Sequence, residues 1–387
     1  MRNDYGNQSE ICKIIILENL NNSSTERILG FDLARAYAIF GMYIVNFTFC
    51  FGSFSNEKTS NWITSLFVGN STSIFIICAG IGLVLLSKNR NKSVIEKSEI
   101  KSKILKRSWF LFGLGLLLYN WWPGDILHFY GGYLHIAAFI LFLDKKYYLW
   151  IAFFAILIYN IAQLFIPFTT GWELPLFKYP DFWTPIGFIR NTFFNGWNSI
   201  FPWFAYFSIG MYLGKLDWND SKIRKNIFII GALLILIFKG LRIFIRYDFN
   251  GPRQDFYEKY WIYIMEDYFP ANIPYIMITT GFALVVISTC IYLGDKFQTK
   301  KIIEILVKTG QMTLTHYVTH MTIGVLLLGS ITQKTYTGFP ILENPISQNL
   351  ILIYALLFFI LSMIFSYFWS KKFKKGPIES LMRKISG

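Results

Sequence analysis

The sequence predicts an all-α, polytopic integral membrane protein, a helical bundle of about ten transmembrane helices with both termini in the cytoplasm. Three observations lead to this prediction. The chain has 387 residues, of which 54% are hydrophobic, 19% aromatic and only 16% charged, too few charges for a soluble protein of this length. The hydrophobic residues are concentrated in long uncharged runs. Most basic residues lie in alternate connections between those runs.

The uncharged runs set the expected number of helices. Nine of them approach or exceed the roughly 20 residues that cross a bilayer as a helix, namely 36–56, 59–87, 108–124, 126–143, 147–172, 191–214, 268–294, 309–333 and 344–370. A shorter run, 226–238, continues into a basic helix end and supplies the tenth span. The two short runs on either side of Pro123-Gly124 should form a hairpin whose tip faces outside.

The formal net charge of +14 follows the same topology. Lys and Arg crowd into the segment 88–107, which holds eight of them, and into 145–146, 215–225, 296–308 and 371–384. The intervening connections carry few, which is the positive-inside pattern and places the basic connections in the cytoplasm. The charge is therefore explained by topology and by anionic membrane lipid, and no nucleic acid is expected as a partner.

Three regions follow from this topology. Residues 1–28 form a cytoplasmic N-terminal tail, 29–370 the transmembrane helical domain, and 371–387 a basic cytoplasmic tail. Within the domain, the connection 168–196 is dense in aromatic residues, which favour the headgroup level of a membrane. It is either a lid on the outer face or an ordinary interfacial belt. The outer loop 247–267 is charged and is expected to cover the outer entrance.

One polar stretch stands out between two of the apolar runs. Asp125, His128 and His135 are spaced three and seven apart, so on a helix they share one face. Ionisable groups at membrane depth are costly and usually serve a function. The alternative for His128 is a structural histidine at the start of a helix, packed under Trp121 and Trp122.

The first span carries a second polar set. Asp32 and Arg35 lie three apart at its cytoplasmic mouth, where they form either a helix-end ion pair that reaches the surface or part of a site. Asn46 lies eleven residues beyond Arg35, deeper and on roughly the same face. It is either an interhelical hydrogen-bonding group or a catalytic one.

Two further groups lie on later spans. Lys239, Arg242 and Arg246 form a basic stripe in the outer half of the membrane, which fits either an anion site or cations that reach the outer headgroups. His316 and His320 are four apart on one helix face. A metal would need a third ligand, which no helix carboxylate clearly offers, so no metal is expected and interhelical hydrogen bonding is the simpler reading.

Other sequence signals narrow the function classes. The chain has no phosphate loop, no nucleotide fingerprint and no Gly-x-Ser-x-Gly elbow, which weakens the case for ATP-driven transport and hydrolase chemistry. Its four cysteines have no metal-ligand spacing. The abundance of Ile, Lys and Asn suggests an AT-rich bacterial genome. We therefore expect a multi-pass protein of the cytoplasmic (inner) membrane of a bacterium.

Four blocks, spread over nearly the whole chain, have a recognisable pattern. They are Phe31-Asp32-Leu33-Ala34-Arg35, Gly124-Asp125-Ile126-Leu127-His128-Phe129-Tyr130-Gly131, Thr309-Gly310-Gln311-Met312-Thr313-Leu314-Thr315-His316-Tyr317 and Lys375-Gly376-Pro377-Ile378-Glu379. In these blocks the chain resembles the YeiB-like bacterial membrane family. That family is grouped with transmembrane acyltransferases that include heparan-α-glucosaminide N-acetyltransferase and bacterial O-acyltransferases.

The chain departs from these relatives at two places. Relatives often use a histidine near the first or second span, and Asn46 lies about where that histidine is expected. In the ninth span, His316 and His320 occupy positions where the YeiB-like pattern usually has amides. The resemblance implies acyl transfer, commonly from acyl-CoA on the cytoplasmic side, to an acceptor at or across the membrane.

Acyl transfer needs a base to remove the acceptor proton and a donor to hold the developing oxyanion. We expect His128 to be the base, with His135 or His316 as the alternative. Asp125 is expected to orient His128, and Asn46 or Tyr130 to hold the oxyanion. His135 is expected to line the path between donor and acceptor. The candidates for binding the donor, acetyl-CoA, are Asp32, Arg35, His316 and His320. The candidates for binding the substrate or an anion are the basic stripe of Lys239, Arg242 and Arg246.

The competing class is a non-enzymatic membrane protein, either a transporter or a lipid- or peptide-binding resistance protein. Intramembrane His, Asp and Arg also suit proton coupling, although the chain lacks the paired halves of many transporters. The acceptor is left open among a small molecule, a glycan, a lipid and a peptide. The oligomeric state is open as well, a homodimer included.

Overall fold

A computed structural model describes residues 27–53, 58–88, 93–248, 267–341 and 343–387. Over these residues the chain is helical, and its one piece of β-structure is an isolated antiparallel bridge between Glu173 and Lys178. The predicted all-α class is therefore confirmed. The N-terminal tail up to residue 26 and the loop 249–266 lie outside the described residues.

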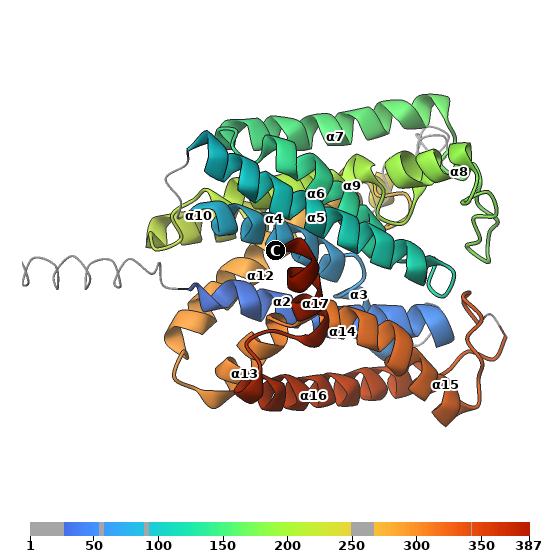
Figure 1. Cartoon of the computed structure of the whole chain (residues 1–387). Helices are drawn as coiled ribbons and strands as arrows, with labels where there is room; N and C mark the ends of the chain where they lie inside the picture. Colours follow the sequence, from blue (N-terminus) through green and yellow to red (C-terminus); the bar gives the residue numbers. More distant parts are fainter. Residues whose placement is uncertain (1–26, 54–57, 89–92, 249–266, 342) are drawn as a thin grey trace, which may run out of the picture.

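Long helices make up most of the described chain, with a few shorter ones between them (Figure 1). The short helices α8 and α14 continue into the π-helical turns η1 and η2. In chain order the described elements are α2 (Leu29–Phe51), α3 (Lys58–Ser65), α4 (Asn70–Lys88), α5 (Val94–Tyr119), α6 (Leu127–Ile140), α7 (Lys145–Phe165), α8 (Pro185–Arg190), η1 (Asn191–Asn195), α9 (Ile200–Gly214), α10 (Ser221–Asp248), α12 (Ile273–Lys296), α13 (Lys301–Gly310), α14 (Thr313–Thr319), η2 (His320–Gly324), α15 (Val325–Thr332), α16 (Gln348–Lys372) and α17 (Pro377–Ser386).

Seven helical segments in the described chain are long and apolar enough to cross a membrane. They are Leu29–Phe51, Trp62–Ser87, Lys145–Phe165, Ser221–Ile245, Ile273–Lys296, Thr313–Thr332 and Gln348–Lys372. The other three of the ten expected runs form α5, α6 and α9, which run among the seven (Figure 1). Helices α6 and α9 are shorter, and α5 is strongly basic in its first half. The chain is therefore a multi-pass membrane protein.

Helix α5 begins well before the apolar run that predicted it. The Oγ of Ser93 accepts a hydrogen bond from the backbone N–H of Glu96, and a Glu96 carboxylate oxygen accepts one from the backbone N–H of Ser93, at 2.9 Å. This capping box satisfies two N–H groups that would otherwise lack partners at a helix start. Most of the basic segment expected to be a loop is therefore the first half of a helix.

Helix α2 lies inside the bundle, in contact with α4, α12 and α13 (Figure 1). Glycines allow neighbouring helices to approach closely, as Gly80 on α4 and Gly210 on α9 do. A Cβ on Gly80 would collide with the carbonyl oxygen of Phe207, and one on Gly210 with that of Ile77. By contrast, α7, α10 and α16 carry large exposed apolar side chains over much of their length, as expected for helices that face lipid.

The aromatic connection 168–196 is an ordered structure rather than a flexible linker. Asn195, in η1, holds it together, because its side-chain amide donates to the carbonyl oxygens of Phe168 and Thr170, both at 2.7 Å. Its Oδ1 accepts from the Tyr179 hydroxyl at 2.8 Å. Phe182 stacks on Tyr119 at the end of α5, with ring centroids 3.5 Å apart. The connection is thereby fixed against the helical bundle.

Candidate functional site

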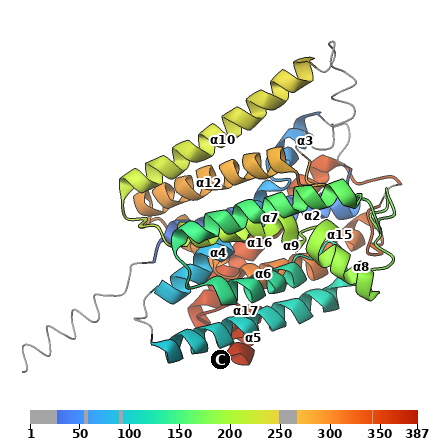
Figure 2. The same cartoon turned by 90° about the horizontal axis from the view of Figure 1, so that it is seen from above.

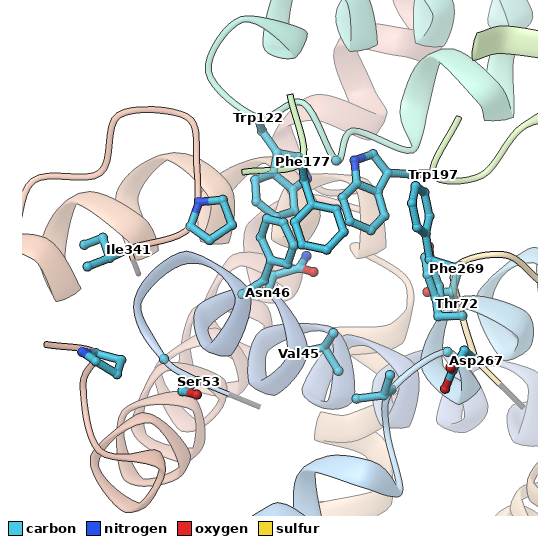
Figure 3. A pocket seen from close by; sticks show the side chains of 18 residues that line it. Val45, Asn46, Ser53, Thr72, Trp122, Phe177, Trp197, Asp267, Phe269 and Ile341 are labelled. Carbon is cyan, nitrogen blue, oxygen red and sulfur yellow. The ribbon is translucent and has the colours of Figure 1, made fainter. Parts of the chain in front are cut away.

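A cavity of about 600 Å³ lies at the C-terminal end of α2 (Figure 3). Its walls are mostly apolar and include six aromatic side chains. They come from α2, the start of α4, the α5–α6 connection, the segments before α8 and after η1, and the segments before α12 and α16. The rings interlock: the centroid of Phe49 lies 5.4 Å from that of Trp122 and 5.3 Å from that of Trp197. Phe177 and Phe269 pack on the same Trp197, with centroids 5.2 and 5.0 Å away. Such a cavity suits a ligand with an apolar or ring-shaped part.

Asn46 provides a polar group in this cavity (Figure 3). Its side-chain nitrogen lies 3.0 Å from Nε2 of His320, which is fully buried on the neighbouring η2. The Nδ1 atom of His320 lies 3.1 Å from the carbonyl oxygen of His316. Because a carbonyl only accepts, Nδ1 carries the proton and Nε2 accepts from Asn46. The histidine is thus held with its basic nitrogen toward the cavity-lining amide.

His316 does not share this arrangement. Its Nε2 lies 2.7 Å from the hydroxyl oxygen of Ser366 on α16, whose own hydroxyl donates to the carbonyl of Ser362 at 2.8 Å. The two histidines therefore bind different partners, one on α16 and one on α2. The structure gives His316 the interhelical hydrogen bond that was the simpler of the two interpretations.

Asp125 and His128 form a second polar centre. One carboxylate oxygen of Asp125 lies 3.1 Å from Nδ1 of His128 and also accepts from its backbone N–H at 3.1 Å. The other accepts from the Tyr317 hydroxyl at 2.9 Å. That hydroxyl in turn accepts from the backbone N–H of Ile126 at 3.2 Å. Both oxygens of the carboxylate therefore have hydrogen-bond partners, which makes its burial tolerable.

His128 is nevertheless shut off from the cavity. The ring is fully buried among Tyr119, Phe129 and Phe182, and its Nε2 has no hydrogen-bond partner among the described residues. Its neighbours Trp122 and Gly124 line the cavity, whereas Asp125 and His128 do not. The predicted base thus lies behind the cavity wall.

Helix α14 connects the two polar centres. Tyr317 reaches Asp125 with its hydroxyl and packs against the ring of His320, with centroids 5.4 Å apart. The π-helical turn begins at His320 itself, and such turns occur frequently at functional sites. Tyr130, the other predicted oxyanion donor, is buried against Phe75, and it does not line the cavity.

Of the residues predicted to bind the donor, Asp32 and Arg35 lie at the opposite end of α2, whereas His320 lies beside Asn46. The buried Asp32 carboxylate accepts from Arg27 and Arg35, both at 2.8 Å, and more weakly from Gln311 at 3.4 Å. Arg35 also donates to the carbonyl of Cys78 at 3.0 Å. The predicted pair is therefore present, and it ties α2 to α4 and to the α13–α14 junction.

The remaining predicted residues lie elsewhere. His135 faces α5, where its Nδ1 lies 3.4 Å from the Ser108 hydroxyl and its ring packs on the exposed Trp109, so it does not line the cavity. Lys239 and Arg242 line a second, smaller cavity. The side chain of Arg246 lies outside the described residues.

Sequence reasoning missed the contact between Asn46 and His320. A signal was present in the two departures from the family pattern, because an amide stands in the first span and histidines in the ninth. The connection 168–196 was expected to be either a lid or an interfacial belt, and the structure uses its Phe177, together with Trp197 just after it, as part of the cavity wall. Which of these groups meet depends on helix packing, which spacing along one helix does not report.

Comparisons with known proteins agree with this architecture. Residues 27–235, more than half of the chain, match the family model of the heparan-alpha-glucosaminide N-acetyltransferase catalytic domain. Residues 212–387 match a family described as a protein of unknown function, DUF418, which is the YeiB-like family. A search of curated proteins gives no match. Both matches confirm the predicted resemblance, and the chain belongs to the heparan-alpha-glucosaminide N-acetyltransferase catalytic-domain family, with a membrane acetyltransferase-like function.

Proposed function

We propose that this protein transfers an acyl group, most simply acetyl, from a CoA thioester to a hydroxyl or amine of an acceptor at or across a bacterial inner membrane. One observation carries the proposal. Of the four histidines of the chain, only His320 is hydrogen-bonded to a side chain that lines the large cavity. A base next to a cavity that can hold the acceptor is what acyl transfer requires.

In the proposed reaction the acceptor enters the cavity and its O–H or N–H replaces the Asn46 amide at Nε2 of His320. His320 takes the proton, the acceptor heteroatom bonds to the acyl carbon, and the carbon–sulfur bond of the thioester breaks. The proton on Nε2 then passes to the leaving thiolate. The displaced amide N–H of Asn46 is free to donate to the carbonyl oxygen, which gains negative charge during the transfer.

The donor would bind from the other end of α2. The thioester supplies an acyl group that is already activated, and its nucleotide part carries phosphates that need cations. Arg27 and Arg35 lie at that end. Lys375 lies near them: the pKa of its ammonium group is lowered, first by burial and then by the positive charges of Arg27 and Arg383. Arginines suit phosphate because they donate in a planar fork. Arg35 and Asn46 are eleven residues apart, roughly 16 Å along the helix.

The test is donor turnover by the full-length protein in proteoliposomes. With acetyl-CoA inside and a mixture of candidate sugars, lipids and peptides outside, wild type should release free thiol. Asn46→Ala should lower that rate by about a hundredfold, the usual effect of losing an oxyanion donor. Asn160→Ala is the matched control, because this amide on α7 donates to the carbonyl of Ile156, within its own helix, at 2.8 Å.

Two results would contradict the proposal. The first is an absence of acetyl-CoA binding and thiol release together with flux of a solute through the same liposomes, which would favour a transporter. The second is thiol release that is equally fast in the Asn46→Ala and Asn160→Ala proteins, which would place the chemistry outside this cavity.

A further inference from the structure

A second cavity, of about 360 Å³, adjoins the first between α3, α10 and α12. The two share three lining residues, Val68, Asp267 and Tyr268. The charged side chains of the second cavity are Lys239 and Arg242 on α10 and Asp267 in the segment before α12, so its lining is net positive. All three also interact within the protein, so any ligand adds to existing contacts.

The depth of these cations in the membrane is unusual. Helix α10 begins at its basic end with Lys222, Arg224 and Lys225, and the next cation along it is Lys239. Fourteen residues of helix span roughly 21 Å, less than the hydrocarbon thickness of about 30 Å. With Lys225 at the cytoplasmic surface, Lys239 therefore lies in the opposite half of the membrane, roughly 9 Å short of the opposite face. A cation at this depth needs either a partner or a path to the headgroups.

The surface around the cations faces lipid. Leu236 and Ile237 before them are 67% and 59% exposed, and Ile243 and Phe244 after them are 69% and 62% exposed. Helix α10 runs along the edge of the molecule with α12 beside it (Figure 2). A ligand with a charged head and apolar chains could place its head on the cations and its chains on the exposed apolar side chains, whereas a free anion would contact only the cations.

A neutral hydrogen-bonding group completes the cavity. The hydroxyl of Tyr275 on α12 is buried and lacks a hydrogen-bond partner among the described residues. A buried hydroxyl without a partner is destabilising unless a ligand or water satisfies it. An oxygen-rich headgroup would accept from it.

We propose that this cavity binds the phosphate-bearing anionic headgroup of a lipid in the leaflet opposite the basic loops. Lys239 and Arg242 pair with the phosphate, Tyr275 donates to it, and the acyl chains lie along the apolar face of α10. Because the two cavities share a wall, the headgroup reaches the edge of the aromatic cavity. If the proposed acyl transfer holds, the acceptor group is carried by this lipid, a step that rests on the proposed function.

The experiment measures lipid retention, independently of catalysis. The full-length protein, purified in mild detergent, is incubated with equal amounts of phosphatidylglycerol and phosphatidylcholine, and bound lipid is counted by native mass spectrometry. Wild type should retain phosphatidylglycerol preferentially. The K239Q/R242Q double variant, which keeps polar side chains of similar size, should lose the preference by about tenfold or more. The matched control K222Q/K225Q removes two exposed cations from the other end of the same helix and should keep it.

A second arm adds soluble glycerol phosphate. Failure to displace the lipid shows that the lipid supplies the phosphate, and displacement that depends on Lys239 and Arg242 shows that a free phosphate ester suffices. The proposal is overturned if wild type shows no preference, or if both double variants lose it equally. Thiol release from acetyl-CoA is measured in the same preparations, so a protein that retains the lipid without turnover refutes the acyltransferase and leaves the lipid site standing.

Discussion

The hydroxyl of Tyr317 donates a hydrogen bond of 2.9 Å to Asp125, although the two residues are 192 positions apart in the chain. This bond joins α14 to the start of α6. Three residues after Tyr317, the same helical segment presents His320 to Asn46 on α2. A single element thus positions both polar centres, and its placement decides whether either can work.

Replacing the histidines separately identifies the base. If His320 takes the acceptor proton, His320→Ala should lower thiol release from acetyl-CoA by about a hundredfold or more. His135→Ala, away from the cavity, should stay near wild type. The first sequence-based choice, His128, makes the competing prediction, because it has the carboxylate partner typical of an activated base. A large loss in His128→Ala with normal folding and an active His320→Ala would move the reaction to that centre.

Tyr317→Phe removes the hydroxyl between the two centres. It leaves the buried Asp125 carboxylate one donor short and the backbone N–H of Ile126 without its acceptor. A loss of about 1–3 kcal/mol in unfolding free energy is expected for such a buried deletion. The measurement is thermal or denaturant unfolding in detergent. Tyr147→Phe, at a position 44% exposed, is the control and should change stability little. Equal stability of the two variants would show that the hydrogen bond contributes nothing.

Gly113 and Gly115 are two residues apart on α5 and so lie on roughly opposite faces of the helix. Together they test the packing that holds Asp125 and His128. A Cβ on Gly115 would collide with the backbone N of His128 and lie 2.5 Å from a carboxylate oxygen of Asp125. A Cβ on Gly113 would meet nothing within 4 Å. Gly115→Ala should therefore destabilise by about 1–3 kcal/mol, the usual result of overpacking. Gly113→Ala should be neutral or stabilising, because alanine favours a helix. The reverse order of melting temperatures would contradict the α5–α6 contact.

Glu379 on the C-terminal α17 caps the helix that carries Tyr317. Its carboxylate accepts from the backbone N–H groups of Leu314 and Thr315, at 2.7 and 3.0 Å, and from the Thr315 hydroxyl. The helix has no side-chain cap of its own at Met312. Glu379→Ala should therefore cost about 1–2 kcal/mol, as expected for a lost cap.

The control for Glu379 is Glu304→Ala, which removes an exposed carboxylate from α13. It should leave the unfolding midpoint in detergent nearly unchanged. If Glu379→Ala and Glu304→Ala unfold at the same temperature, the C-terminal segment does not support α14. In that case a truncation before Pro377 would also leave stability intact.

The sequence by itself determined the class of the protein and its local geometry. A bilayer allows only backbone that satisfies its own hydrogen bonds, so uncharged runs of sufficient length had to be helices. The contact between Asp125 and His128 follows from a spacing of three residues at a helix start, and the ion pair between Asp32 and Arg35 from the same spacing. Both interactions form within about one helical turn and do not depend on a second helix.

Only the tertiary structure decided which polar groups meet across helices. Spacing could not show that His320 turns to Asn46 while His316 turns to Ser366, because both lie on one helix and the neighbouring helices differ. It also could not show that the aromatic connection supplies cavity walls, or that His128 is sealed behind one of them. The physical reason is that inside a membrane protein a side chain finds its partner on whichever helix packs against its face. That packing is fixed by close-contact glycines and interlocking aromatic rings far apart in the chain.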